Sequence, residues 1–197
     1  MKTSKELRNQ AWEQLRKSYW MVLVVTLIVV ALPAGTSIGI IGFIIAGPLL
    51  VGQSIYLIDM IETNPEGKKI ELLLEGFKKS FVNSLLAWLL TSIFTFLWSL
   101  LFIIPGIIKG LAYSMTPYIL AENPDMDAMK AIDQSQEMMK GHKMDLFMLY
   151  LSFIGWFILA MLTFGVGMIF LMPYINTTVA NFYLELRGKK VVTAEIE

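Results

Sequence analysis

Residues 81–120, FVNSLLAWLLTSIFTFLWSLLFIIPGIIKGLAYSMTPYIL, decide how this chain folds, because they contain a single charged residue, Lys109. The stretch divides at Pro105-Gly106, a pair that favours a turn. The runs on either side, Phe81–Ile104 and Ile107–Leu120, are apolar enough to be solvated by lipid. We therefore expect a hairpin of two membrane spans, although the second run is short for a span and could instead form a re-entrant segment.

The same organisation extends over the whole chain of 197 residues. Hydrophobic residues make up 56% of it and charged residues 16%, whereas soluble domains have about 25% charged residues. Apart from Lys109, every charged residue lies within residues 2–17, 59–79, 122–145 or 185–197. The sequence predicts an all-α, polytopic membrane protein that forms a single membrane domain, 1–197. The six predicted transmembrane helices are Tyr19–Leu32, Ile38–Ile58, Phe81–Ile104, Ile107–Leu120, Leu146–Phe164 and Val166–Leu184.

The joints between these spans predict their orientation. Three joints are short and uncharged, at 33–37, at Pro105-Gly106 and at Gly165-Val-Gly167, so the spans pair into three helical hairpins. Every Lys and Arg except Lys109 then lies on the side opposite to the hairpin turns. Because positively charged connectors stay in the cytoplasm, we expect a multi-pass protein of the plasma membrane. Both termini, including the tail at 188–197, are expected to be cytoplasmic.

An internal repeat links the three hairpins. The motif Phe43-Ile-Ile-Ala-Gly47 aligns with Phe102-Ile-Ile-Pro-Gly106, and the same spacing aligns Asn64-Pro65 with Asn123-Pro124. Apolar segments resemble one another by chance, but the Asn-Pro match lies outside the predicted spans and favours a true repeat. The repeat units are about 4–62, 63–122 and 123–187, and the third is the weakest match.

Each predicted hairpin is preceded by an amphipathic stretch that ends in a basic group. The three stretches are Leu7–Lys17, Ile70–Lys79 and Ala128–Lys143. In the first, apolar side chains recur at helical spacing, at Leu7, Ala11, Trp12 and Leu15. A helix of this kind lies at the membrane interface or packs under the bundle. Three units in the same orientation predict a pseudo-threefold arrangement about the membrane normal.

Polar side chains gather in the second span of each hairpin. In a membrane such side chains usually face the bundle interior, where they bond across helices or line a wet cavity. The candidates for the interior, or for contact with a ligand, are Gln53, Tyr56, Tyr113, Ser114, Asn176 and Asn181. Interhelical hydrogen bonding and ligand binding both remain open for them.

Lys109 is the one charge within the predicted spans. It closely follows the expected turn at Pro105-Gly106, so its amino group could snorkel to the outer headgroups. The alternative is a contact with an anionic lipid or ligand at the outer face. Gly106 and Gly110 are spaced so that they allow a close helix crossing beside it.

The composition argues against several classes of function. The chain has no Cys and one His, His142, so we expect no disulfide, no thiol nucleophile and no metal site. A net charge of zero gives no basis for binding nucleic acid. The sequence lacks the motifs of serine hydrolases, zinc proteases and P-loop enzymes. We therefore expect no catalytic residue, no cofactor and no enzyme activity.

Several motifs resemble those of a known bacterial family. They are FIIPGIIKGLAYSM at 102–115, YILAENP at 118–124, AIDQS at 131–135, MMKGHK at 138–143 and LSFIGW at 151–156. Over residues 5–187 the chain resembles the integral-membrane family catalogued as domain of unknown function number 975, with Glu122 where that family often has Asp. It is more distantly similar to the membrane domain of some glycerophosphodiester phosphodiesterases, without their catalytic domain. The resemblance implies a bacterial plasma membrane and brings no reaction, cofactor or site residue.

The sequence leaves two functions open. The first is a non-enzymatic accessory, scaffold or protective module that acts through helix packing and its amphipathic helices. The second is a carrier or channel-like protein for a lipid or an amphipathic small molecule, which would use the polar faces of the second spans. The expected partners are membrane lipids, another membrane protein or a second copy of the chain.

Overall fold

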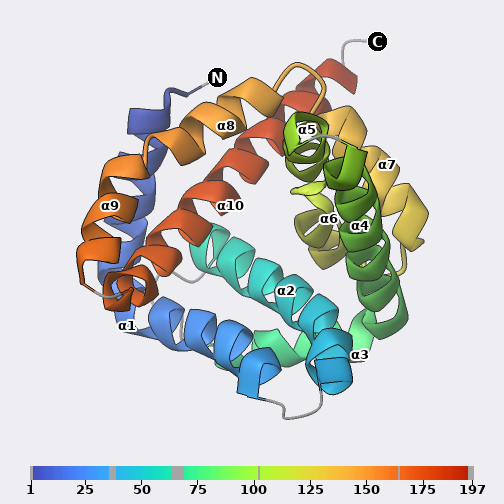
Figure 1. The fold of residues 1–197 in the computed structure, drawn as a ribbon, viewed down its shortest axis with the longest axis horizontal. Helices are drawn as coiled ribbons and strands as arrows, with labels where there is room; N and C mark the ends of the chain where they lie inside the picture. The colour runs from blue at the N-terminus through green and yellow to red at the C-terminus, as the bar shows by residue number, and fades with distance from the viewer. Residues whose placement is uncertain (1, 36–38, 64–68, 102, 164, 195–197) are drawn as a thin grey trace. The chain divides into compact units, whose positions relative to one another are not determined.

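All regular secondary structure in the described part of the chain is helical, as expected. The computed structural model describes residues 2–35, 39–63, 69–101, 103–163 and 165–194. Of the turn predicted at 33–37, residues 33–35 belong to the end of α1, and Thr36-Ser37 lie outside the described residues, as do the Asn64-Pro65 match and the end of the tail. The helices (Figure 1) are α1 Ser4–Gly35, α2 Gly39–Glu62, the 3-10 helix η1 Ile70–Leu74, α3 Glu75–Lys79, α4 Phe81–Leu101, α5 Ile103–Tyr113, α6 Thr116–Glu122, α7 Ala128–Met138, α8 Lys143–Leu151, α9 Ile154–Leu162 and α10 Val166–Ala194.

Four helical segments among the described residues are long and apolar enough to cross a membrane. They are Ser4–Pro33, Gly42–Glu62, Phe81–Leu100 and Lys143–Leu162, which indicates a multi-pass membrane protein. Helix α10 has 29 residues but is not among the four, because Pro173, Asn176 and Asn181 lower its hydropathy. The predicted span Ile107–Leu120 is divided between α5 and α6, and neither is long enough to span alone.

The chain forms two compact units that each combine segments distant in the sequence. Unit 1 comprises Met1–Ile28, Tyr56–Ile70 and Met144–Glu197. Unit 2 comprises Val29–Ile55 and Glu71–Lys143. Helices α1 and α2 therefore contribute one part to each unit.

Helix α1 bends at Ser18, whose φ of −132° and ψ of 22° are not helical. The part before the bend is the predicted amphipathic stretch. Its residues Leu7, Ala11 and Leu15 are buried, whereas Trp12 is 49% exposed. The amphipathic segment is therefore a bent extension of the first apolar helix, and three of its four predicted stripe residues pack into the protein.

Side-chain amides join α1 to α10 in unit 1. Gln10 Nε2 donates to Oδ1 of Asn181 at 3.0 Å, and Asn181 Nδ2 donates to Oε1 of Gln14 at 2.6 Å. The same nitrogen donates to the carbonyl oxygen of Thr177 at 3.0 Å. Because Asn181 is buried, water does not compete strongly for these bonds. Asn181 therefore bonds across helices, which is one of the two roles expected for it.

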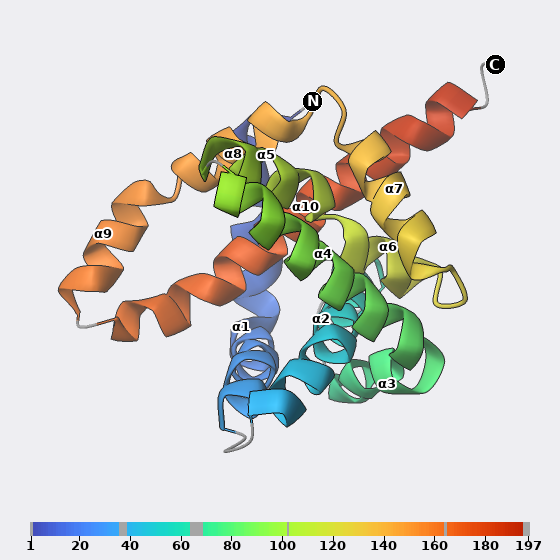
Figure 2. The ribbon, with the colours of Figure 1, turned by 45° about the vertical axis from the view of Figure 1, so that its right-hand side comes forward.

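In unit 2, helix α4 packs beside α5, α6 and α7 (Figures 1 and 2). Helix α4 ends at Leu101 and α5 begins at Ile103, so the turn predicted at Pro105-Gly106 is wrong. Proline is accepted in a first helical turn, because an N–H there has no intrahelical partner. At Gly106 a Cβ would lie 2.8 Å from the Cα of Ser99, so α5 crosses α4 closely there, whereas a Cβ at Gly110 would lie 3.7 Å from Cγ2 of Thr95, an ordinary contact.

The apolar helices differ in how far the protein covers them. In the most apolar window of Gly42–Glu62, 61% of the residues are buried, against 11% for Phe81–Leu100 and 22% for Lys143–Leu162. Large side chains on the two less covered segments, such as Leu100 and Met161, are strongly exposed. Apolar surface of this extent suits a lipid environment and would be unfavourable in water.

Replacing Asn181 by leucine should destabilise unit 1, because Gln10 and Gln14 would each lose a buried partner. We expect a loss of about 1 kcal/mol, since interhelical hydrogen bonds in membrane proteins average about 0.6 kcal/mol each. Thermal unfolding of the purified protein in detergent measures this. Asn176→Leu is the matched control, because the Asn176 side chain forms no hydrogen bond with the described residues and is only partly buried. Equal losses in the two variants would contradict the role of the amide network.

Candidate ligand-binding pocket

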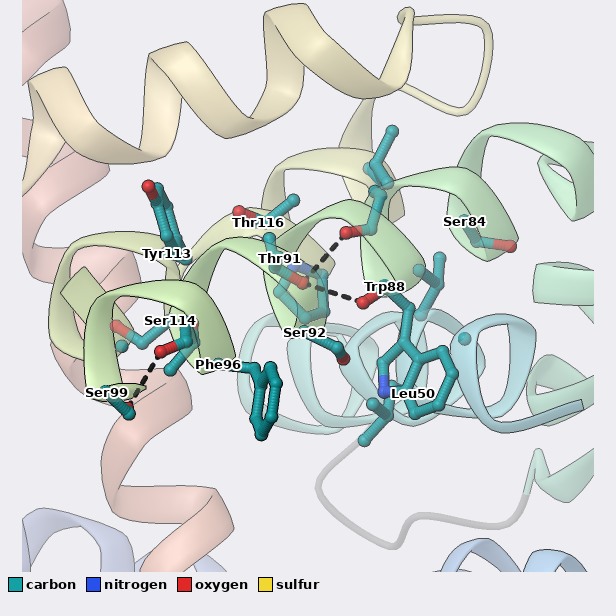
Figure 3. A pocket seen from close by; sticks show the side chains of 17 residues that line it. Leu50, Ser84, Trp88, Thr91, Ser92, Phe96, Ser99, Tyr113, Ser114 and Thr116 are labelled. Atoms are coloured by element: carbon teal, nitrogen blue, oxygen red, sulfur yellow. Dashed lines mark hydrogen bonds between the residues drawn. The ribbon is translucent and has the colours of Figure 1, made fainter. Parts of the chain in front are cut away.

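A pocket of about 500 Å³ lies between α2, α4, α5 and α6 in unit 2 (Figure 3). Its volume falls in the range of small-molecule sites. The polar side chains that line it are Ser84, Thr91, Ser92, Thr95, Ser99, Tyr113, Ser114 and Thr116, and the larger apolar ones are Leu50, Val51, Trp88, Phe96, Pro117 and Leu120. None of the lining residues is charged, so the pocket combines hydroxyl groups with apolar walls.

One wall of the pocket is a row of hydroxyl groups on α4. Ser84, Thr91, Thr95 and Ser99 recur at helical spacing and therefore share one face of the helix. Thr91 donates to the carbonyl oxygen of Ala87 and Ser99 to that of Thr95, both at 2.8 Å (Figure 3). Such bonds within one helix leave a hydroxyl oxygen free to accept a further hydrogen bond.

Among the described residues that line the pocket, Thr116 is the one with a buried side-chain oxygen that lacks a hydrogen-bond partner. Its side chain is 3% exposed, and its Oγ1 has no hydrogen-bond partner within the described part of the chain. A buried hydroxyl without a partner costs about 1–3 kcal/mol. The Oγ1 atom is closed to water in this conformation, so a ligand in the pocket would remove the penalty once the Thr116 side chain rotates its hydroxyl toward the pocket.

The helix beside Thr116 is interrupted because of Pro117. Helix α5 ends at Tyr113 and α6 begins at Thr116. Pro117 has no N–H to donate to the carbonyl of Tyr113, and a proline ring clashes with the carbonyl four residues before it. Polar groups of the backbone therefore lose their helical partners at this break, next to the pocket.

Ser135 of α7 satisfies two of these groups. Its hydroxyl donates to the carbonyl oxygen of Ala112 at 2.8 Å and accepts from the backbone N–H of Met115 at 3.2 Å. Ser135 is fully buried, so the two bonds replace the intrahelical bonds that the break removes. The shape of the pocket wall formed by α5 and α6 thus depends on a side chain from another helix.

Lys109 is held by side chains of α4, α5 and α7. Its Nζ donates to Oε1 of Gln136 at 3.3 Å and lies 5.2 Å from the ring centre of Trp98 and 5.9 Å from that of Tyr113. A cation at these distances is attracted by the aromatic rings. Gln136 belongs to α7, within a stretch that the sequence predicted to be cytoplasmic. This contact conflicts with the expected position of Lys109 at the outer face.

Helix α7 runs alongside α4, as two contacts near its ends indicate. Asn83, near the start of α4, donates to the carbonyl oxygen of Pro124 at 3.3 Å, before α7 begins. Gln136, near the end of α7, bonds Lys109, which itself lies over Trp98 near the end of α4. The third amphipathic stretch therefore packs along the helices of unit 2.

The pocket brings together two of the six predicted candidates. Tyr113 and Ser114 line it. Gln53 is buried in unit 2 but outside the lining, and Tyr56, Asn176 and Asn181 belong to unit 1. The hydroxyl row of α4 was not predicted, although its helical spacing is visible in the sequence. Ser135 was noted only as the last residue of the motif AIDQS at 131–135, without a role.

Comparison with known proteins finds a family that matches part of the chain. Residues 102–190 match the family described as Protein of unknown function (DUF975), and the match begins at α5 and covers the remaining helices except the end of α10. The expected resemblance is confirmed over this part of the chain. No curated protein and no solved structure matches the chain.

Replacing Ser135 by alanine should destabilise the protein by about 1–3 kcal/mol, because Met115 N–H and the carbonyl of Ala112 would lose a buried partner. Thermal unfolding measures the loss, and hydrogen exchange of the amides at 111–118 should accelerate. Ser99→Ala is the control, because that hydroxyl bonds only within its own helix. Unchanged exchange at 111–118 in Ser135→Ala would refute the role of Ser135 at the break.

Proposed function

We propose that this chain is a bacterial membrane protein that binds an uncharged amphipathic molecule in the pocket of unit 2 and catalyses no reaction on it. The observation that carries the proposal is the break between α5 and α6 beside the unpartnered hydroxyl of Thr116. Interrupted helices at membrane depth occur where the backbone is buried in protein or lines a cavity. In several transporters such interruptions form the binding site.

The chemistry of the lining suggests the class of ligand. Lys109 neighbours the pocket, but its amino group is engaged by Gln136 and two aromatic rings. The ligand would therefore meet hydroxyl groups, aromatic rings and aliphatic side chains. A long-chain alcohol or a glycerolipid without a phosphate has this combination of an apolar body and a neutral polar group.

The lack of catalysis is part of the proposal. Proton transfer at neutral pH needs a side chain with a suitable pKa, such as His, Asp, Glu or Lys. The lining residues offer hydroxyl groups and rings, and the only titratable side chain among them is Tyr113, whose phenol is a weak acid at neutral pH. We therefore assign binding, and with it a carrier role, rather than chemistry.

A second candidate function is an accessory or scaffold module, whose partner would be another membrane protein or a second copy. The closed amide network of Gln10, Gln14 and Asn181 favours it, because this network holds α1 and α10 together without leaving a polar group for a ligand. The two functions differ in what they require of Thr116. Binding requires its hydroxyl, and a scaffold does not.

The proposed topology has six spans in three hairpins, with α10 and the broken pair α5–α6 as spans and both termini in the cytoplasm. A pair of matching bends supports the underlying repeat. Ser18 precedes the apolar part of α1 with φ −132° and ψ 22°, and Ser80 precedes α4 with φ −140° and ψ 30°. Each is buried, follows a lysine and precedes an aromatic residue.

The charged side chains of α7 place a strong constraint on this topology. The side of α7 that does not pack against the other helices of unit 2 carries Lys130, Asp133 and Glu137, all of them exposed. Charged groups in hydrocarbon are strongly unfavourable. If α4 spans the membrane, the neighbouring α7 must turn this side to water or to protein. We propose that it faces water continuous with the cytoplasm.

The ligand proposal predicts a specific loss on replacing Thr116 by valine. Labelling of the pocket by a photoactivatable diacylglycerol should fall about fivefold, since a hydrogen bond contributes about 1 kcal/mol, and Thr116→Ser should restore it. Thr91→Val is the matched control, because the Thr91 hydroxyl also lines the pocket but already donates to its own helix. The phosphate-bearing analogue, phosphatidic acid, should label poorly. Equal labelling of wild type and Thr116→Val would refute the assignment and favour the scaffold.

The topology proposal predicts the sidedness of single cysteines, which are straightforward to interpret because the chain has none of its own. A cysteine that replaces Asp125 or Asp133 should react with an impermeant thiol reagent only when the reagent has access to the cytoplasmic side. Cysteine at Val166, beside the last hairpin turn, should react only from outside. Reaction of Asp125 and Val166 from the same side would overturn the six-span topology, and an unreactive Asp133 would overturn the proposed exposure of α7 to water.

A further inference from the structure

An aromatic groove of about 540 Å³ in unit 1 is separate from the pocket already described. It lies between α1, α9 and α10, and its aromatic side chains are Trp12, Tyr19, Trp156, Phe170 and Tyr174. No charged residue lines it. Both tyrosine hydroxyls donate to the backbone, Tyr19 to the carbonyl of Phe170 and Tyr174 to that of Arg8, each at 3.1 Å. The groove therefore presents mainly apolar surface to an occupant.

The α9 side of the groove is open where the helix is not covered by protein. Trp156 and Leu159 line the groove and are 53% and 56% exposed. They belong to Lys143–Leu162, one of the segments apolar enough to cross a membrane. An apolar chain could thus enter the groove sideways from the bilayer, without crossing water.

Basic residues flank the groove on α1. Arg8 and Arg16 lie four residues before and after Trp12, so the three side chains share one face of the helix. Arg8 donates from Nη1 to the carbonyl oxygen of Ser152 at 2.6 Å and lies 5.6 Å from the ring centre of Phe153, so its guanidinium is engaged by protein groups and contributes chiefly its positive charge. Arg16 is exposed. Guanidinium groups bind phosphate with paired N–H donors.

We propose that this aromatic groove binds one acyl chain of an anionic glycerophospholipid, with the lipid phosphate held beside Arg8 and Arg16. The apolar lining accounts for the chain, and the charge of the two guanidinium groups accounts for the anionic headgroup. Residues 2–17 carry five basic side chains, Lys2, Lys5, Arg8, Arg16 and Lys17, and two acidic ones, Glu6 and Glu13. The net positive charge of this segment also favours an anionic ligand. Anionic lipids attract basic residues near the membrane surface by about 1 kcal/mol each.

The test uses the full chain reconstituted in nanodiscs with trace photoactivatable lipids that carry the reactive group near the end of an acyl chain. Phosphatidylglycerol should label the segments 156–163 and 167–174 more strongly than phosphatidylcholine with the same chains. Leu159→Trp should fill the groove and lower this labelling severalfold. Leu162→Trp is the matched control, because Leu162 is 75% exposed on the same helix but does not line the groove.

The headgroup contact is tested separately. Arg16→Gln should lower labelling by phosphatidylglycerol about fivefold, the equivalent of about 1 kcal/mol, without changing thermal unfolding. Lys17→Gln removes the same charge one residue away, outside the face of Trp12, and should have little effect. Equal labelling by the two lipids, or equal effects of Arg16→Gln and Lys17→Gln, would overturn the anionic headgroup. Equal labelling of wild type and Leu159→Trp would overturn the site and indicate ordinary bilayer contact only.

Discussion

The two hydrogen bonds of Ser135 are the interaction on which unit 2 depends. Where water is scarce, every backbone N–H and carbonyl needs a protein partner, and Pro117 prevents α5 and α6 from forming one continuous helix. The hydroxyl of Ser135 accepts from Met115 and donates to Ala112, so α7 completes the hydrogen bonding of a break that it does not contain. The pocket wall, the position of Tyr113 and the contact between Lys109 and Gln136 all follow from this packing of α7.

Unit 1 solves a related problem with amide side chains. Apolar helices in lipid gain little from burying apolar surface against one another, so polar contacts and close packing select which faces meet. Asn181 fixes α10 against α1 through Gln10 and Gln14, much as Ser135 fixes α7 against α5 and α6. In both units the specific contacts come from a few short polar side chains within predominantly apolar surroundings.

The sequence was sufficient for features that depend on local composition. The helical class, the long apolar segments, the turn at Gly165 with its φ of +84° and the close approach at Gly106 follow from runs, breakers and spacing. The turn predicted at Pro105-Gly106 lies within the first turns of α5, because Pro105 is compatible with a first helical turn as well as with a loop. The roles of Ser135 and Gln136 depend on which helices meet, and no periodicity in one segment carries that information. The pocket was predicted only in part for the same reason. The more polar second spans pointed to Tyr113 and Ser114, whereas the wall formed by α4 was not predicted.

The order of Ser135 and the break along the chain has a consequence for biogenesis. A ribosome releases α5 and α6 before α7, because synthesis runs from the N-terminus. The segment that leaves the insertion machinery first therefore carries the unpaired N–H of Met115 and carbonyl of Ala112, and the residue that pairs them arrives later. Until α7 has been synthesised, α5 and α6 must stay in contact with water, lipid headgroups or a helper protein. The assembly of unit 2 is thereby tied to the completion of α7, because a nascent chain that stalls before Ser135 lacks the side chain that pairs these two backbone groups.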